Sequence, residues 1–416
     1  MDMKAIDANQ LQRYADLLVH KGAALKEGQE LVLEAPVERV DFARMVVKSA
    51  YEAGAGHVTV IWHDDVVQRL TYQNVAMPFF EHTPSWQREQ LNTLAEAGAS
   101  FLFLEGSDPS ILDGIDPAKP AAAARSRNSE CTSFRNGMDF GMNVWCIAGV
   151  PVESWATKVF PGVSGDEAVG RLWAAILSVS RADGDDPEAA WDSHNANFQR
   201  NLRFLNGHAF DALRYKADNG TDLTVGLNKG HVWEGGASTT VDGVSFFPNI
   251  PTEEVFTTPD RLRTEGVVHS ALPLVHAGNI VEDFWFRFED GRVVDYGAKS
   301  GREILEHILK SDDNASYLGE CALISKDTPI RQSGILFYDT LYDENASCHL
   351  ALGMGFPECI EGGFDMDKDQ LLAHGVNQSV THVDFMIGSD DLNVWGVEPD
   401  GTEVPVFADG RWAWDK

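Results

Sequence analysis

The sequence predicts two domains of different class: an α/β N-terminal domain with a mostly parallel sheet, and an α+β C-terminal domain with antiparallel pairing. In the first part of the chain, short apolar strands alternate with helices long enough to cross between parallel strands. The later part is rich in strands and in two-residue turn signals. Between them, residues 181–187 form an acidic stretch with glycine and proline. We therefore expect residues 1–186 to form the first domain and residues 187–416 the second.

The strands expected in the first domain are short apolar runs. They lie at residues 30–33, 58–62, 101–104 and 144–150. Between the first two, Phe42, Met45 and Val46 recur at helical spacing, and Gly54 ends that helix. Further helices are expected at residues 86–97 and 167–180.

The second domain opens with a helix expected at residues 188–205, and then becomes rich in strands. Alternating or strongly apolar runs predict strands at residues 222–227 and 284–288. Residues 302–310 predict one further helix. Four dipeptides typical of hairpin turns follow the strands: Asn219-Gly220, Asp290-Gly291, Asp400-Gly401 and Asp409-Gly410. Mixed helices and antiparallel pairs indicate an α+β domain.

The chain is strongly acidic, with 64 Asp and Glu against 33 Lys and Arg and a formal net charge of −31. Such a surface repels phosphate backbones and anionic lipid, so neither nucleic acid nor a membrane is an expected partner. No apolar run approaches the ~18 residues that a membrane span needs, and no secretory signal is visible. The five cysteines are scattered and form no C-x-x-C pair, which favours reduced thiols and a cytoplasmic location.

Several familiar catalytic motifs are absent from the sequence. There is no phosphate-binding loop, no H-E-x-x-H helix and no G-x-S-x-G elbow. Asp365, Asp367 and Asp369 resemble the start of a calcium loop, but Gln370 stands where that loop requires glycine. We interpret these aspartates as a solvated acidic turn.

The most informative segment surrounds His382 and Asp384, in the run THVDFMIG. Its alternation predicts a strand, so that the two side chains point to the same face while Val383 and Phe385 point to the other. An imidazole and a carboxylate held side by side on a strand suit a metal ion. A hydrogen-bonded His/Asp pair on an exposed strand is the alternative.

Three more segments carry candidate ligands. His349 follows polar residues, among them Glu344, at the start of a stretch that we expect to be helical; a buried structural histidine is the alternative there. Glu253 and Glu254 lie between two prolines, in a segment stiff enough to aim a carboxylate. Glu320 enters an apolar strand, where a carboxylate must be paired, protonated or bound to metal. Together these segments supply ligands suited to a pair of divalent ions such as Zn, Co or Mn.

The same four segments, in this order, resemble the M29 family of metallo-aminopeptidases, which includes the aminopeptidase T, aminopeptidase S and PepS types. The resemblance covers essentially the whole chain, including residues 11–51 and 190–194. It implies a metal-dependent aminopeptidase of broad specificity, with the metal site in the second domain and two divalent ions (Zn, Co or Mn). It also implies peptide substrates with a free N-terminus, a homodimer, and a site enclosed in an internal cavity.

Carried over residue by residue, the resemblance implies five metal ligands: Glu254, Glu320, His349, His382 and Asp384. Glu320 is expected to bridge the two ions. Glu254 is preferred to its neighbour Glu253 as the ligand. Proton transfer is assigned to Glu320 or Glu344.

One position departs from the family pattern. The family usually has a tyrosine seven residues after the ligand histidine, and here that residue is Phe356. A phenyl ring cannot donate a hydrogen bond or bind metal, so a non-catalytic or weakly active metal-binding homodimer is the alternative function. A phosphoesterase is the other alternative, but it would be expected to add Arg or Lys for phosphate, and the four segments contain neither.

Overall fold

The computed structural model describes residues 7–276 and 279–414. Contacts between residues divide the chain into two compact units, Met1–Ser193 with Ala237–Pro251, and His194–Gly236 with Thr252–Lys416. The chain therefore returns to the first unit once after leaving it. The domain boundary expected between residues 186 and 187 stays a prediction. It implies that a fragment ending at residue 186 folds by itself.

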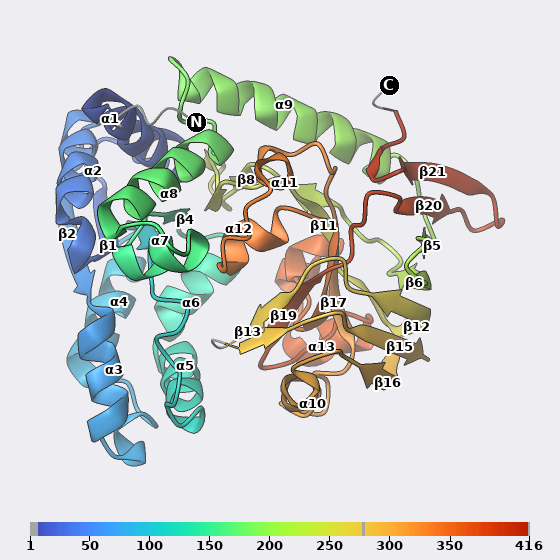
Figure 1. Ribbon diagram of the computed structural model, residues 1–416. Helices are drawn as coiled ribbons and strands as arrows, with labels where there is room; N and C mark the ends of the chain where they lie inside the picture. The colour runs from blue at the N-terminus through green and yellow to red at the C-terminus, as the bar shows by residue number, and fades with distance from the viewer. Residues whose placement is uncertain (1–6, 277–278, 415–416) are drawn as a thin grey trace. The chain divides into compact units, whose positions relative to one another are not determined.

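The first unit contains a five-stranded sheet whose neighbouring strands all run parallel, in the order β10-β4-β3-β1-β2 (Figure 1). The strands are β1 Glu30–Pro36, β2 His57–His63, β3 Ser100–Glu105, β4 Trp145–Gly149 and β10 Asn249–Ile250. The four strands expected from the sequence are thus confirmed. The fifth strand was not expected, because it comes from the segment that returns late in the chain.

Helices alternate with the parallel strands along the chain, as the sequence predicts. They are α1 Ala8–Leu17, α2 Val40–Glu52, α3 Asp65–Asn74, α4 Ser85–Glu96, α5 Ala118–Glu130, α6 Thr132–Asp139, α7 Glu153–Val159 and α8 Gly165–Val179. The α2 helix buries Phe42 and Val46 on one face, which confirms the helical spacing seen in the sequence. Helix α3 has no buried residue. A further pair of short strands, β8 Ser238–Thr239 and β9 Ser245–Phe246, belongs to this unit.

The second unit is built on two antiparallel sheets. The larger has the order β16-β15-β12-β6-β5-β20-β21-β22. Its strands are β5 Ala212–Lys216, β6 Asp222–Leu227, β12 Pro259–His269, β15 Trp285–Glu289, β16 Arg292–Gly297, β20 Asn393–Val397, β21 Glu403–Ala408 and β22 Arg411–Trp412. Each of the four turn dipeptides connects two adjacent strands of this sheet, so all four hairpins are confirmed.

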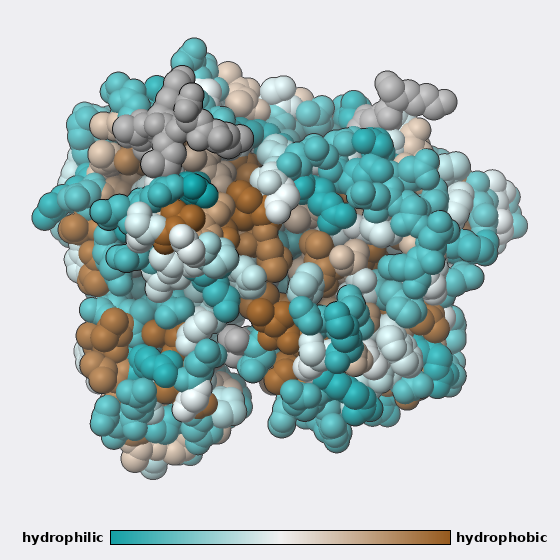
Figure 2. Space-filling view, viewed as in Figure 1, coloured by the Kyte–Doolittle hydropathy of each residue, from teal (hydrophilic) through white to brown (hydrophobic). Residues whose placement is uncertain are grey.

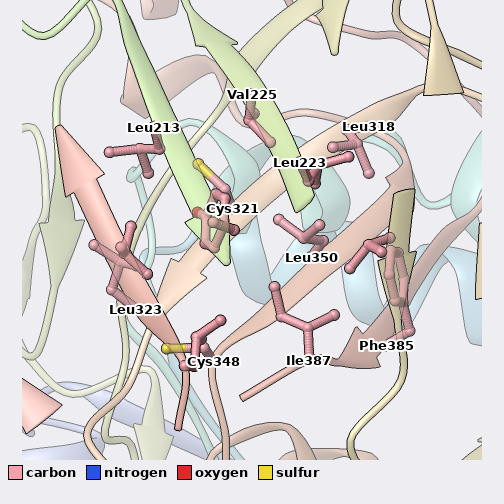
Figure 3. Packing of buried hydrophobic residues seen from close by; sticks show 14 of the residues in the cluster. Leu213, Leu223, Val225, Leu318, Cys321, Leu323, Cys348, Leu350, Phe385 and Ile387 are labelled. Atoms are coloured by element: carbon pink, nitrogen blue, oxygen red, sulfur yellow. The ribbon is translucent and has the colours of Figure 1, made fainter. Parts of the chain in front are cut away.

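The smaller sheet has the order β19-β18-β17-β11-β7. Its strands are β7 Glu234–Gly235, β11 Val255–Thr257, β17 Leu318–Leu323, β18 His349–Gly353 and β19 His382–Met386. One face packs into the core that it shares with the larger sheet. Figure 3 shows Leu350 and Phe385 of the smaller sheet in one buried cluster with Leu213 and Val225 of the larger one. Because side chains alternate along a strand, the opposite face is free to carry polar groups.

The remaining α-helices of the described residues are α9 Pro187–Asn206, α10 Arg302–Leu309, α11 Pro329–Ser333, α12 Thr340–Glu344 and α13 Lys368–Ala373. Strand β13 Leu274–His276 pairs antiparallel with β14 Asn279–Val281. The prediction that His349 lies in a helix is wrong, because α12 ends before this residue and His349 is the first residue of strand β18. The acidic turn contains a helix start, since Asp367 caps α13. All five cysteines are buried free thiols. None of the helices within residues 7–276 and 279–414 has the length and apolar character of a membrane span.

Candidate metal centre

Strand register brings two of the candidate carboxylates into one row. Ala351 of β18 pairs with Glu320 on one side and with Asp384 on the other. Glu320 and Asp384 therefore lie two strands apart on the same face, with a methyl group between them. The small side chain of Ala351 leaves room above the sheet for the two carboxylates to converge.

The two histidines are held by the backbone in the same way. The Nδ1 atom of His382 lies 2.8 Å from the carbonyl of Met354. The Nδ1 atom of His349 lies 3.1 Å from the carbonyl of Glu344. A carbonyl only accepts hydrogen bonds, so each Nδ1 carries the proton and donates. This arrangement presents both Nε2 atoms to the site, because a carbonyl that accepts from one ring nitrogen fixes the tautomer and the ring orientation of a metal-binding histidine.

Each Nε2 atom faces carboxylate oxygens. His349 Nε2 lies 3.3 Å from Glu254 Oε2. His382 Nε2 lies 3.1 Å from Glu320 Oε2 and 3.1 Å from Asp384 Oδ1. Ligand atoms around a tetrahedral ion with bonds of about 2.1 Å stand about 3.4 Å apart, close to these separations.

These side chains form two potential ligand groups within the described chain. One is Glu254, Glu320 and His349, and the other is Glu320, His382 and Asp384; within each group the ligand atoms lie within 4.8 Å of one another. Glu320 belongs to both groups. The two potential ligand groups thus share one carboxylate.

A cation fits this site because one buried oxygen lacks a partner. The single N–H that His382 can place on Nε2 is directed to Glu320. Asp384 Oδ1 lies equally near, but it is buried and makes no hydrogen bond to any described residue. Oxygen and imidazole nitrogen together are the donor set that Zn, Co and Mn accept. An ion at this point would satisfy all three side chains at once.

The electrostatics also favour positive charge. Burial alone would lower the pKa of His349, but its contact with Glu254 and the charge of Glu320 raise that pKa to about 10. Burial opposes charge on His382 too, yet Asp384 and Glu320 raise its pKa well above the usual value. Burial would raise the pKa of Asp384, but the charge of His382 lowers it to about 2. In the metal-free chain, protons on the imidazoles supply the positive charge that the carboxylates require.

A small cavity of about 60 Å³ opens beside the second ligand group and is lined in part by Glu344, His382 and Asp384. The exposed fraction of the side chain falls from 25% at His382 to 1% at His349. Access from the cavity is therefore to the group that contains His382. Burial, together with the charges of Asp384 and Glu254, raises the pKa of Glu344 well above its usual value.

The structure also shows where Glu253 and Phe356 lie. Glu253 is absent from both ligand groups; its carboxylate lies 3.6 Å from His194, and its backbone N–H donates to Asn345 over 2.7 Å. The ring of Phe356 lies 5.0 Å from the ring of His382, so at the departing position a phenyl group supports a candidate ligand without offering a hydroxyl.

The structure thus brings together all five side chains that were expected to be ligands, and places Glu344 on the adjoining cavity. Sequence reasoning missed Ala351, Met354 and Asp339. Ala351 is recognisable only from strand register, and Met354 acts through its carbonyl, which no side chain reveals. Asp339 also lines the cavity, but in the sequence it resembles an ordinary residue before a helix.

Comparison with known proteins assigns the chain to a family. The family model described as "Thermophilic metalloprotease (M29)" matches residues 7–412. Aminopeptidase AmpS of Bacillus subtilis (strain 168) is 43% identical over 406 residues, covering 98% of this chain and 99% of that protein. Aminopeptidase T of Thermus aquaticus is 41% identical over 402 residues, covering 97% and 98%.

A solved structure agrees with these sequence relationships. The wild-type AmpT structure from Thermus thermophilus matches with a TM-score of 0.90 and 39% identity, covering 97% of this chain and 99% of that one. Sequence and fold therefore match over nearly the full length, and the chain belongs to the M29 family of metalloproteases.

Proposed function

We propose that this protein is a metal-dependent aminopeptidase that removes N-terminal residues from peptides with the help of two divalent ions. The observation that carries the proposal is the pair of ligand groups joined by Glu320. Membership of a metalloprotease family and relatives named as aminopeptidases support it. Glu254, Glu320 and His349 would hold one ion, and Glu320, His382 and Asp384 the other. Zn, Co and Mn are the candidate metals.

Two adjacent divalent ions, when bound, lower the pKa of a water molecule to near neutrality and polarise a carbonyl oxygen. The chain itself supplies orientation and proton transfer. Met354 and the carbonyl of Glu344 fix the imidazole rings, and Glu320 is held between both groups. Glu344 belongs to neither ligand group among the described residues, and its raised pKa lets it hold a proton. We therefore assign transfer of the proton to the leaving amine to Glu344 rather than to Glu320.

Two alternative functions are less well supported. A phosphoesterase would need positive side chains for phosphate, and no Lys or Arg lines the cavity in the part of the chain that the structure describes. A non-catalytic metal-binding protein is not favoured, because the relatives that match nearly the full length are named as aminopeptidases.

The function is tested by hydrolysis of leucine p-nitroanilide with added cobalt, zinc or manganese. We expect activity that EDTA abolishes and that metal restores. His382→Ala should abolish it too, whereas the matched control His374→Ala, at an exposed histidine of the same unit, should leave it unchanged. Metal-loaded protein that cleaves no peptide with a free amine would refute the proposal.

We further propose that the protein forms a homodimer through helix α3. Val66, Val67 and Leu70 are all exposed on this helix, which buries no residue. Hydrophobic residues gather at the left edge of Figure 2, where Figure 1 places α3 and α4. Light scattering after size-exclusion chromatography should give twice the chain mass, and Leu70→Glu should give the monomer mass. A location in the cytoplasm, where thiols stay reduced, would suit the five free cysteines.

A further inference from the structure

The cavity beside the second ligand group is lined by more carboxylates than metal binding uses. Asp339 and Asp343 line it together with Glu344 and Asp384, over a volume of about 60 Å³. Asp339 is the N-cap residue of helix α12 and Glu344 ends the helix, so this short helix and its N-cap residue carry three of the four. No Lys or Arg lines the cavity within the described chain. The cavity is therefore small and lined by acidic side chains, and its lining includes the candidate metal ligands His382 and Asp384.

Most of these oxygens already have partners. Asp343 accepts the backbone N–H of Phe337 on one oxygen, over 2.8 Å, and that of Asp339 on the other, over 3.1 Å. Glu344 Oε1 lies 3.5 Å from the side-chain amide of Asn345. Asp384 faces His382. Asp339 Oδ1, like Asp384 Oδ1, is buried and has no hydrogen-bond partner among the described residues, but Asp339 belongs to neither ligand group.

A buried carboxylate oxygen without a partner is costly unless a proton or a cation meets it. Burial raises the pKa of Asp339 to about 6, although hydrogen bonds from the backbone N–H groups of Tyr342 and Leu341 oppose this rise. The carboxyl group is therefore still mostly ionised near pH 7 and above. The nearby His276 is neutral, since burial lowers its pKa, and it offers no positive charge. The missing partner is thus expected to be a cation from outside the chain.

The cavity has room for a small cation. A volume of about 60 Å³ is on the order of two water molecules, enough for a single ammonium group. Aminopeptidase substrates carry such a group at their N-terminus, with a pKa of about 7.7–8.0 that keeps it largely charged at neutral pH.

We propose that Asp339 binds the α-ammonium group of the peptide substrate and thereby restricts cleavage to the first peptide bond. The inference rests on the proposed aminopeptidase function. The Asp339 carboxylate would accept an N–H of the ammonium group while the adjoining carbonyl lies toward His382 and Asp384. A peptide bound through its interior has no ammonium group to fill this position, and would leave the buried oxygen without a partner.

A pair of inhibitors tests this role without relying on turnover. Leucine hydroxamate and 4-methylpentanoic hydroxamate share the metal-binding group and the side chain, and differ only in the amine. We expect the wild-type protein to bind the amine-bearing inhibitor more tightly. Asp339→Asn should reduce that preference by about 10- to 100-fold, the value of a charged hydrogen bond, and leave the affinity for the desamino inhibitor and the metal content unchanged. The exposed Asp365→Asn serves as control and should keep the wild-type preference.

The outcomes separate this inference from the proposed function. Wild-type protein that fails to hydrolyse leucine p-nitroanilide with metal contradicts the function itself. Active wild-type protein whose amine preference survives in Asp339→Asn contradicts the ammonium site alone, as does an equal loss of affinity for both inhibitors. If the asparagine variant does not fold, Asp339→Glu decides: it keeps the charge but displaces the carboxylate, so a reduced preference supports the site and an unchanged preference overturns it.

Discussion

At the scale of single residues, the two candidate ligand histidines are oriented before any ion binds. His349 and His382 each donate Nδ1–H to a backbone carbonyl, which leaves Nε2 facing carboxylates. In the metal-free chain each Nε2 must carry a proton. An unprotonated ring nitrogen and a carboxylate oxygen are both acceptors, so neither could donate a hydrogen bond to the other. Metal and proton therefore compete for the same positions.

This competition predicts a pH dependence with a definite sign. The pKa of folded His349 is raised to about 10, above its unfolded value. The stabilisation it gives the metal-free chain is thus fully present below about pH 6.5 and is lost as the pH rises toward 10. Metal removes that proton, so binding at pH 8 should release about one proton from His349. Calorimetry in buffers of different ionisation enthalpy measures this release; heats that do not depend on the buffer would contradict it.

Phe356 leads to a prediction about catalytic rate. Its ring stands 5.0 Å from the ring of His382, where a hydroxyl would lie near the metal ligands. Phe356→Tyr adds a hydrogen-bond donor that can stabilise negative charge on the reacting carbonyl, so we expect kcat to rise by about tenfold or more with little change in KM. Phe356→Leu, which adds no donor, is the control. A kcat that is the same in the tyrosine variant and the wild type would mean that this position has no catalytic use for a hydroxyl.

At the scale of elements, strand β18 lies between the two strands that carry Glu320 and Asp384. Ala351 separates Glu320 from Asp384 in the register, and both neighbours depend on its small size. We predict that Ala351→Leu lowers metal affinity by at least about tenfold, since overpacking displaces the carboxylates at a cost of about 1–3 kcal/mol. Equilibrium dialysis measures the affinity, and Ala408→Leu, on an exposed strand position, is the control. Unchanged metal binding in Ala351→Leu would show that the two carboxylates do not converge over this residue.

The element scale also explains what the sequence could and could not predict. Strands such as β2 and β15 have β-branched or aromatic residues, and turn dipeptides mark the hairpins, so these elements were predictable. Strand β18 reads HLALG, which contains no β-branched residue and has high helix propensity. Its strand conformation comes from pairing with β17 and β19, which local sequence does not reveal.

Only part of the candidate site was predictable from the spacing of residues in the sequence. The pairing of His382 with Asp384 follows from the period of a strand, and the structure places both on one face. The meeting of Glu254, Glu320 and His349 does not follow from any spacing, because β11, β17 and β18 become neighbours only in the folded sheet. For those three residues, the resemblance to a family supplied what periodicity could not.

At the scale of the whole molecule, the chain returns to its first unit late. Strand β10 pairs with β4 and buries Ile250, although it lies more than sixty residues beyond the expected boundary at 186/187. A fragment of residues 1–186 lacks this strand and exposes the edge of β4. We predict that this fragment aggregates or unfolds at lower temperature than one that adds residues 237–251 through a linker, as followed by circular dichroism. Equal stability of the two fragments would support the simple boundary at 186/187.

In the proposed metal centre, two ions share Glu320. Diffraction from metal-soaked crystals, recorded at the absorption edge of the added metal, tests it most directly. We expect two anomalous peaks, one enclosed by Glu254, Glu320 and His349 and the other by Glu320, His382 and Asp384. A single peak, or peaks that contact neither histidine, would contradict it.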